Sequence, residues 1–308
     1  MFYYSPAMNA PFSSLPADRR ALFALAAGAV AVGASPIFLR LGEMGPFAAA
    51  FHRAFLAIPA IAVWLLIVDR GKIERPKNTG DAALMALAGF FFAGDLAFWH
   101  LSLFGTAVAN ATLFANTAPV FVVLIGWVLF RQTVTKTFVA GMALALLGAI
   151  CLIHASLSFR PDRLTGDAYG VVTAMFLAGY LLTLERLRRT YGAAVILFWS
   201  TVATAVCLLV PALIFEGQLF AESAEGWLML LALAWISQAA GQGLIAYALA
   251  VLPASITAVG LLLEPVAAAL LAGFILHEGL GPWQLVGGVV VLAGIALARL
   301  GAIGDTKN

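Results

Sequence analysis

The feature that most constrains this chain is a series of apolar runs, each about 18 to 25 residues long, that recur along its whole length. A helix of that length can cross a hydrocarbon core of roughly 30 Å. The runs are too long for barrel strands and show no alternation, so helices are what satisfies the backbone in lipid. The sequence therefore predicts an all-α integral membrane protein with ten transmembrane helices, at about 20–39, 46–68, 81–104, 107–130, 137–154, 166–186, 191–215, 226–249, 253–276 and 281–300.

The composition excludes an ordinary soluble protein. Hydrophobic residues make up 63% of the 308 residues and charged residues only 10%, whereas soluble domains carry about 25% charged residues. The mean hydropathy is +1.01, and the ten runs leave too little chain for a separate soluble domain. The expected partners are therefore a lipid bilayer and a small-molecule substrate, with no nucleic acid.

The basic residues are unevenly divided between the segments that connect the runs. If the N-terminus is cytoplasmic, the cytoplasmic segments hold thirteen Lys and Arg residues, whereas the opposite segments hold three: Arg40, Arg160 and Arg163. Connecting segments rich in Lys and Arg tend to stay in the cytoplasm. We therefore expect a multi-pass protein of the cytoplasmic (inner or plasma) membrane, with both termini inside the cell.

The chain contains an internal repeat. A shift of 146 residues superposes Pro119 on Pro265, Gly141 on Gly287 and Gly148 on Gly294. These glycines are expected at close helix contacts. The predicted organisation is a tail at 1–19, a five-helix repeat at 20–155, a second five-helix repeat at 164–301 and a tail at 302–308. Five spans per repeat force the second copy to enter the membrane from the opposite side, which gives two inverted repeats, as in many secondary transporters.

Two segments of the repeat resemble a known family. "TAPVFVVLIGWVLFRQTVTKTFVAGMALALLGAICL" and "LEPVAAALLAGFILHEGLGPWQLVGGVVVLAGIAL" are similar to the two copies of the EamA signature of the drug/metabolite transporter superfamily. The turn carries Gln132 in the first copy, where the family often has Glu, and Glu278 in the second. The resemblance implies export of small metabolites, many of them amino acids, across the cytoplasmic membrane. Among the branches, the aromatic amino-acid exporters are the most similar.

The interior of the third run contains two ionisable residues, which are costly within a span and mark functional sites by default. Asp95 and Trp99 are four residues apart and share one helix face, while His100 points about 100° away from Trp99. We expect at least one of Asp95 and His100 to line a transport pathway, with Trp99 as an apolar surface for an amphipathic side chain. The alternative is structural: Asp95 bonds a neighbouring helix and His100 is a packing residue with a satisfied ring.

A second acid lies inside the ninth run, where Glu264 directly precedes Pro265. A carboxylate at this depth is protonated, paired or in contact with water. Glu264 is a candidate to hold the ammonium group of an amino acid or to take a proton in a coupled cycle. A hydrogen bond to the eighth run, which carries Gln238 and Gln242, is the alternative.

Stripes of polar and aromatic residues in the fourth, sixth and eighth runs complete the candidate site. Such stripes suit a small-molecule pocket with apolar walls and a few polar groups, although packing is the alternative at each position. The substrate-binding candidates are Asp95, Trp99, His100, Asn116, Tyr180, Trp235, Gln238, Gln242 and Glu264.

Arg53 is the basic residue placed within a run, near the outer end of the second. We expect it to be structural and to reach or pair near the outer surface, with a contact to the substrate carboxylate as the alternative. Carriers of nucleotide sugars or sugar phosphates need Lys or Arg in the cavity to bind phosphate. The sequence therefore favours zwitterionic, cationic or neutral cargo over such phosphorylated cargo.

Membrane enzymes need a convergent set of a nucleophile and a base, or of metal ligands. Asp95 and His100 diverge on their helix, so with Glu264 they make a poor ligand set. We expect no catalytic residue, metal or cofactor. The predicted function is secondary transport that exports amino acids, aromatic or otherwise bulky and neutral, by alternating access through a cavity between the repeats. A nucleotide-sugar carrier, a membrane-embedded enzyme and a sensor are the alternatives.

Overall fold

The computed structural model describes residues 17–68, 74–106, 108–131, 134–153, 164–275 and 281–304. Within these residues the regular elements are all helices. Nine helical segments in this part of the chain are long and apolar enough to cross a membrane, and a shorter apolar helix covers Lys136–Cys151. The turn residues Gln132 and Glu278 lie outside the described residues.

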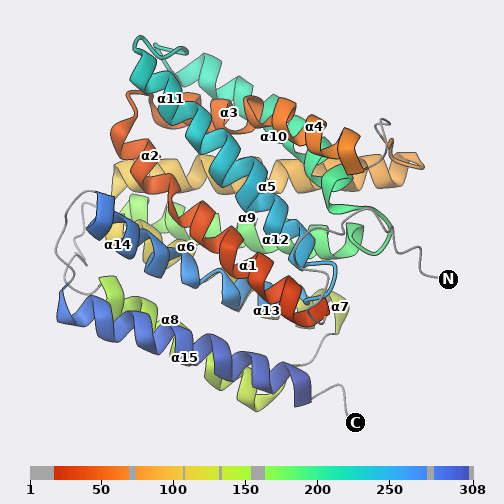
Figure 1. The fold of residues 1–308 in the computed structure, drawn as a ribbon, viewed down its shortest axis with the longest axis vertical. Helices are drawn as coiled ribbons and strands as arrows, with labels where there is room; N and C mark the ends of the chain where they lie inside the picture. Colours follow the sequence, from red (N-terminus) through yellow and green to blue (C-terminus); the bar gives the residue numbers. More distant parts are fainter. Residues whose placement is uncertain are drawn as a thin grey trace.

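Ten spans follow one another in two sets of five (Figure 1). The first set consists of α1 (Ala17–Gly33) with α2 (Ser35–Leu41), α3 (Pro46–Phe55) with α4 (Ala57–Val68), α5 (Thr79–Gly105), α6 (Val108–Ala115) with α7 (Ala118–Phe130), and α8 (Lys136–Ile153). The second set consists of α9 (Leu164–Leu187), α10 (Ala193–Phe215), α11 (Ala224–Ala232) with η3 (Leu233–Gln242) and α12 (Gly243–Ala248), α13 (Ala254–Gly260) with α14 (Leu263–Ile275), and α15 (Pro282–Gly304).

Four spans of the described chain are interrupted along their length. Proline has no N–H and its ring crowds the preceding turn, so it ends or kinks a helix. Pro36, Pro119 and Pro265 each follow a break within four residues. The breaks in spans 4 and 9 correspond under the 146-residue shift to within one residue. The four breaks fall at Ala34, Leu56, Asn116–Thr117 and Leu261–Leu262.

The contact between α8 and α15 reveals how the two repeats are related. A Cβ atom on Gly148 of α8 would lie 2.5 Å from Val291 N, and one on Gly294 of α15 would collide with Ala145 N. The shift of 146 residues converts the first contact into the second. Such reciprocal contacts between antiparallel helices require a two-fold axis across the pair, and they confirm the predicted close packing of these glycines.

α5 packs along α9 and against α10. Side-chain hydroxyls tie these spans together. Ser102 Oγ of α5 donates to Gly166 O at 2.8 Å, and Thr204 Oγ1 of α10 donates to Gly89 O at 3.0 Å. Hydroxyls commonly join helices in this way within a membrane. α5 therefore holds the residues of its middle turns in a fixed position.

α3 is held at its first turn by a residue far along the chain. Glu216, which follows α10, accepts a hydrogen bond from Phe47 N through Oε1 at 2.8 Å. A carboxylate at this position satisfies one of the free N–H groups of the helix and opposes its dipole. The same loop ends at Ser223, whose Oγ accepts from Gly226 N at 2.9 Å and starts α11.

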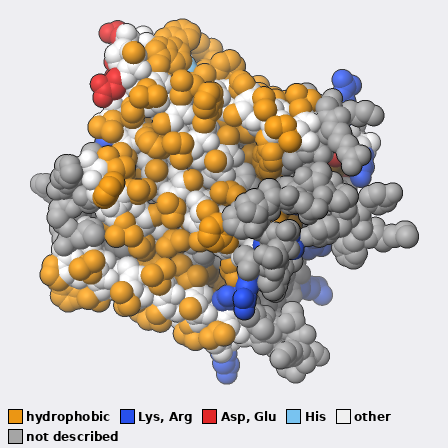
Figure 2. Space-filling view, in the orientation of Figure 1, with side chains coloured by type: hydrophobic (Ala, Val, Ile, Leu, Met, Phe, Trp, Pro, Cys, Tyr) orange, Lys and Arg blue, Asp and Glu red, His pale blue; other side chains and the backbone are white. Residues whose placement is uncertain are grey.

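The surface of the bundle is apolar over most of its area (Figure 2). Ile67, Trp127 and Leu213 are 72%, 61% and 59% exposed, which is expected for side chains that face lipid. Figure 2 shows Lys and Arg side chains gathered on the right, the side on which α1 begins and α15 ends in Figure 1. We call this side of the molecule the basic end.

Candidate functional site

A cavity of about 780 Å³, its open mouth included, lies between the two repeats. It occupies the region where spans 1, 4 and 9 are interrupted, and these breaks contribute Gly33, Ser35, Pro36, Asn116, Leu261 and Pro265 to its lining. Interrupted helices place free backbone groups and polar side chains near the middle of a membrane, which is where transporters bind their cargo.

Three charged side chains face this cavity. Among its described lining residues, Arg53 of α3 is the one cation, and Asp95 of α5 and Glu264 of α14 are the two acids. Arg53 interacts electrostatically with both carboxylates, and more strongly with Asp95. Both acids are half-buried, so part of each side chain is open to the cavity. The three elements thus bring opposite charges together inside the membrane, where they can pair with a cargo that carries charges of its own.

The position of Arg53 corrects the expectation from the sequence. Its side chain is 3% exposed and does not reach the outer surface. Nε donates to Gln238 Oε1 at 3.2 Å, and the guanidinium carbon lies 5.9 Å from the centre of the Phe92 ring. A buried cation needs such partners because it has lost its hydration. The reason for the difference is that α3 points this residue inward, toward α5 and η3.

The remaining lining separates into an apolar wall and a few polar groups. Trp99, Leu96, Leu177 and Leu261 supply apolar surface. Further polar side chains come from spans 1, 4, 6 and 8; they are Ser35, Thr112, Asn116, Thr173 and Gln242. The mixture is the one found in pockets for small amphipathic molecules. Of the nine residues predicted from the sequence, five line the cavity: Asp95, Trp99, Asn116, Gln242 and Glu264.

His100 is not among the lining residues. It is 1% exposed, its Nδ1 lies 2.6 Å from Leu96 O, and its ring meets Trp99 edge-on with centroids 5.1 Å apart. The histidine is thus buried, as the alternative reading expected, but its ring is only half satisfied, because Nε2 is buried without a hydrogen-bond partner among the described residues. Its role beside the cavity is to support Trp99.

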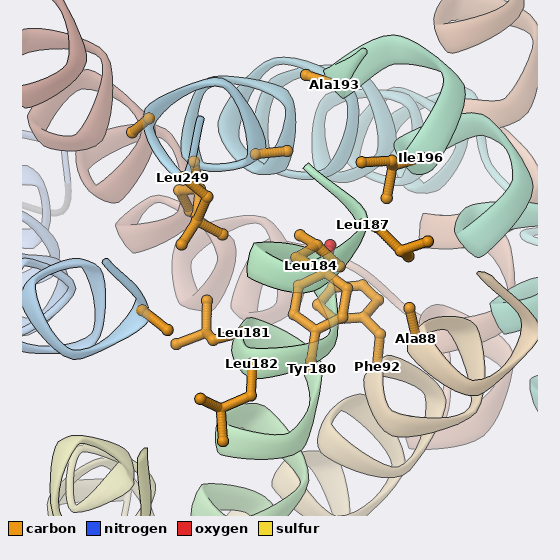
Figure 3. Packing of buried hydrophobic residues seen from close by; sticks show 14 of the residues in the cluster. Ala88, Phe92, Tyr180, Leu181, Leu182, Leu184, Leu187, Ala193, Ile196 and Leu249 are labelled. Atoms are coloured by element: carbon orange, nitrogen blue, oxygen red, sulfur yellow. The ribbon is translucent and has the colours of Figure 1, made fainter. Parts of the chain in front are cut away.

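Tyr180 belongs to the packed core rather than to the cavity. It is 1% exposed, and its ring lies 4.7 Å from that of Phe92, with Leu184 and Leu187 nearby in Figure 3. The stripe predicted on α9 is divided, because Thr173 faces the cavity and Tyr180 lies two turns further along the helix. Tyr180 thus supports Phe92, which in turn lies against Arg53.

Span 8 contains a π-helical stretch, η3, that separates its predicted site residues. Gln238 is buried and accepts the hydrogen bond from Arg53, whereas Gln242 lines the cavity. Trp235 is 52% exposed, and its Nε1 donates to Leu56 O at 3.1 Å, away from the cavity. A π-helix turns less per residue than an α-helix. The expectation that Trp235 lines the pocket is therefore wrong.

Apolar packing closes the cavity toward the basic end. On α1, α5, α9 and α13 the cavity residues are followed toward that end by a buried cluster. The cluster includes Leu25, Ala88, Leu181, Leu184, Leu249 and Ala258, and Figure 3 shows part of it. Side chains packed at this density exclude solutes.

The comparison with known families agrees with this architecture. The model of the EamA-like transporter family matches residues 19–154 and 164–300, once for each repeat. The chain belongs to the EamA-like transporter family. The family has two repeats of five helices, and the ten spans described above follow that plan.

Relatives of this EamA chain are also transporters by name. A probable amino-acid metabolite efflux pump of Salmonella typhimurium is 27% identical over 74% of this chain and 80% of its own length. A probable terminal-alkyne amino-acid exporter of Streptantibioticus cattleyicolor is 27% identical over 88% and 90%. An uncharacterised transporter of Archaeoglobus fulgidus is 27% identical over 85% and 91%. These names indicate transport rather than catalysis.

A solved crystal structure has the same fold as this EamA chain. It superposes with a TM-score of 0.79, with 18% identity, over 92% of this chain and 98% of the other. At that identity the likeness concerns the fold alone.

The site predicted from the sequence differs from the cavity lining in two ways. One lining residue was expected elsewhere, and others were not predicted. Arg53 was expected at the surface, and Ser35 and Pro36 were not considered for the site. A signal for Ser35 and Pro36 was present in the prolines at 36, 119 and 265, which mark where spans are interrupted. Residues beside these breaks are candidates for the site in any chain of this architecture.

Proposed function

We propose that this chain exports amino acids with aromatic or other bulky neutral side chains from the cell, by alternating access of the cavity between its repeats. The observation that carries the proposal is that Arg53 and Asp95, which attract each other, line the same cavity as the apolar surface of Trp99. An amino acid presents a carboxylate, an ammonium group and an apolar body in the same compact arrangement.

The head group of the cargo is bound by the charged pair. Arg53 offers free N–H groups for the cargo carboxylate, because Gln238 occupies only its Nε. Guanidinium binds carboxylate through two parallel hydrogen bonds. Asp95 receives the ammonium group. A zwitterion brings no net charge into the membrane, and each of its charges meets an opposite one there.

The body of the cargo lies against the apolar wall. Trp99, Leu177 and Leu261 line the cavity together and give it an apolar side. An aromatic side chain gains by stacking on the indole of Trp99 beyond the area that it buries. Bulky apolar side chains are therefore preferred over small ones.

The charge distribution bears on the side to which the cavity of this structure opens. Connecting segments rich in Lys and Arg are expected in the cytoplasm, so the basic end faces inward. The apolar cluster then lies between the cavity and the cytoplasm, and we take this state to face outward, where cargo would be released. The names of the relatives from Salmonella typhimurium and Streptantibioticus cattleyicolor, an efflux pump and an exporter for amino acids, support the same direction.

Nucleotide sugars and sugar phosphates are poor cargo for this cavity. Two carboxylates and one guanidinium face it among the described residues. A phosphate group would bring its negative charges to a site whose one guanidinium is already opposed by a carboxylate, and uncompensated charge is costly where water is scarce. The position of Arg53 in the cavity lining therefore does not favour phosphorylated cargo.

Counterflow in proteoliposomes tests the proposal. Vesicles loaded with unlabelled phenylalanine should take up labelled phenylalanine, leucine and tryptophan faster than glycine. Arg53→Lys should lower the apparent affinity about tenfold or more, because an ammonium cannot replace the two parallel hydrogen bonds of guanidinium. Absence of counterflow for all twenty amino acids by the wild-type protein would refute the proposal, and so would wild-type affinity in monodisperse Arg53→Lys.

A further inference from the structure

The cavity holds one acid more than a zwitterionic cargo requires. Among its described lining residues, one guanidinium faces two carboxylates. With Arg53 on the carboxylate of the cargo and Asp95 on its ammonium group, Glu264 keeps no opposite charge. An isolated ionised carboxylate inside a membrane is costly. Glu264 must therefore bind a proton or another positive charge whenever the site as a whole is neutral.

Glu264 is the acid that Arg53 compensates least. Arg53 attracts Asp95 more strongly than Glu264, and Asp95 repels Glu264 more strongly than Arg53 attracts it. The two acids also come from different halves of the protein, since Asp95 lies on α5 and Glu264 on α14. Glu264 thus lines the cavity from the other half of the protein than the two residues that receive the head group.

We propose that Glu264 binds either a proton or the side-chain cation of a basic amino acid, so that lysine-like cargo is exchanged for a proton while neutral cargo is not. This inference rests on the proposed export of amino acids. With neutral cargo the carboxyl group of Glu264 keeps its proton and the loaded site has no net charge. With basic cargo the ammonium or guanidinium of the side chain takes the place of that proton.

The exchange balances in charge and in protons. Binding of basic cargo converts the carboxyl group of Glu264 to a carboxylate, its O–H bond breaks, and the proton passes to water in the cavity mouth. The loaded site again has no net charge, since the added cation replaces the proton. Release of the cargo on the other side leaves the carboxylate free to take up a proton there.

The charged groups that act on Glu264 come from α3 and α5. Arg53 of α3 and Asp95 of α5 interact with it directly. Tyr180 of α9 and His100 of α5 lie further away, where they interact with Asp95 and Arg53. Neither lines the cavity, so neither can meet the side chain of the cargo. Span 8 contributes the uncharged Gln238 and Gln242, and the described lining residues of α1 and α2 are uncharged.

The test measures binding of lysine and of phenylalanine to the purified wild-type protein between about pH 5 and pH 9. Because lysine displaces one proton, its dissociation constant should fall by up to tenfold for each unit that the pH rises, over the range in which Glu264 is protonated. The dissociation constant of phenylalanine should show no such fall. A pH-sensitive dye should report release of a proton when lysine binds and none when phenylalanine binds. In vesicles, a lumen more acidic than the outside should accelerate uptake of lysine, because protons leave as lysine enters. The same gradient should not accelerate uptake of phenylalanine.

The outcomes separate the two proposals. If phenylalanine binds and lysine does not, or if both bind with the same pH dependence, the inference about Glu264 is overturned and amino-acid export stands. If neither amino acid binds, the proposed function itself fails. The wild-type measurement requires no substituted protein to fold.

Substitution of the acid gives a second, independent check. Glu264→Gln, which resembles the protonated carboxyl group, should reduce the ratio of lysine to phenylalanine affinity at least tenfold and abolish the dependence on pH. Asp95→Asn is the matched comparison and should weaken the binding of both amino acids. A monodisperse Glu264→Gln protein that still releases a proton when lysine binds would overturn the inference.

Discussion

At the scale of single residues, Arg53 determines the charge balance of the cavity. Its Nε is engaged by Gln238 and its face by Phe92, and Tyr180 packs behind Phe92. Two residues that the sequence suggested as direct ligands of the cargo thus support the arginine instead, Gln238 by direct contact and Tyr180 through Phe92. This arrangement fixes the guanidinium before cargo arrives, which reduces the entropy lost on binding.

Two tryptophans allow the apolar wall to be tested. Trp99 lines the cavity and Trp235 is 52% exposed on the outside of the bundle. Trp99→Ala should raise the apparent KM for phenylalanine and tryptophan about tenfold or more, because loss of apolar contact costs the binding of bulky side chains most. The measurement is the concentration dependence of counterflow for each amino acid.

The matched control for this change is Trp235→Ala, which removes an indole of the same size from the lipid-facing surface. Its KM should equal that of the wild-type protein. If Trp235→Ala weakens transport of bulky amino acids as much as Trp99→Ala does, the cavity described here is not where their side chains bind.

Sequence patterns predicted the face of α5 well and that of span 8 poorly. Asp95 and Trp99 are four residues apart on a regular α-helix, so both point to the cavity. Trp235 and Gln238 lie three apart in η3, where the wider π-helical turn changes which positions share a face. An argument based on a period of 3.6 residues cannot detect that change. The position of Arg53 depends on the packing of α3 against two other spans, which a pattern within one span does not contain.

At the scale of helices, the interruptions of spans 1, 4 and 9 and the regular pair α8 and α15 have opposite roles. The interrupted spans surround the cavity and supply its polar groups. α8 and α15 make the most extensive helix contact of the described chain and contribute no side chain to the cavity lining. Their packing holds the two repeats together while the interrupted spans bind cargo.

Gly148 tests the importance of this packing. A Cβ at this position would lie 2.5 Å from Val291 N and 2.9 Å from Gly287 O, both of which are backbone atoms that cannot turn aside. Gly148→Val should therefore separate α8 from α15 and lower the temperature at which the detergent-solubilised protein loses its monodisperse peak. Leu147→Val, at a neighbouring position that is 57% exposed, is the control and should leave that temperature unchanged. Equal stability of the two variants would show that the contact is not needed.

The spans and the glycine contacts were predictable because they depend on local composition and on the repeat. Ten apolar runs correspond to ten spans, with α8 the shortest, and Gly148 and Gly294 meet the partner helix as expected. The breaks within the runs were not predicted as such. An apolar run continues across Leu261–Leu262 without a change in hydropathy, and only the following Pro265 indicates that the helix is interrupted.

At the scale of the whole molecule, charge separates the two ends of the bundle. Exposed basic side chains at the basic end include Arg19, Lys77, Arg186 and Arg189, whereas Glu43, Glu222 and Glu225 are exposed at the other end. We expect the basic end in the cytoplasm. Single cysteines at Lys77 and Thr190 should react with an impermeant maleimide only after the membrane is opened. A third tag at Lys307 lies outside the described residues and carries the same expectation for the C-terminus.

Two native cysteines must be replaced before these tags are read. Cys207 is exposed and Cys151 is half-buried, so both could react. A tag at Glu222, at the opposite end, is the control and should react in intact cells. Labelling of Lys77 or Thr190 from outside would reverse the orientation, and the cavity of this structure would then open to the cytoplasm.

The central claim is that Arg53 and Asp95 bind the head group of an amino acid whose side chain rests on Trp99. A structure of the protein with bound 4-bromophenylalanine tests it most directly, because the bromine can be located from its anomalous scattering. The account predicts a bromine peak beside Trp99, the carboxylate within hydrogen-bonding distance of Arg53 and the ammonium group within reach of Asp95. A bromine peak outside the cavity, or a head group that contacts neither Arg53 nor Asp95, would contradict it.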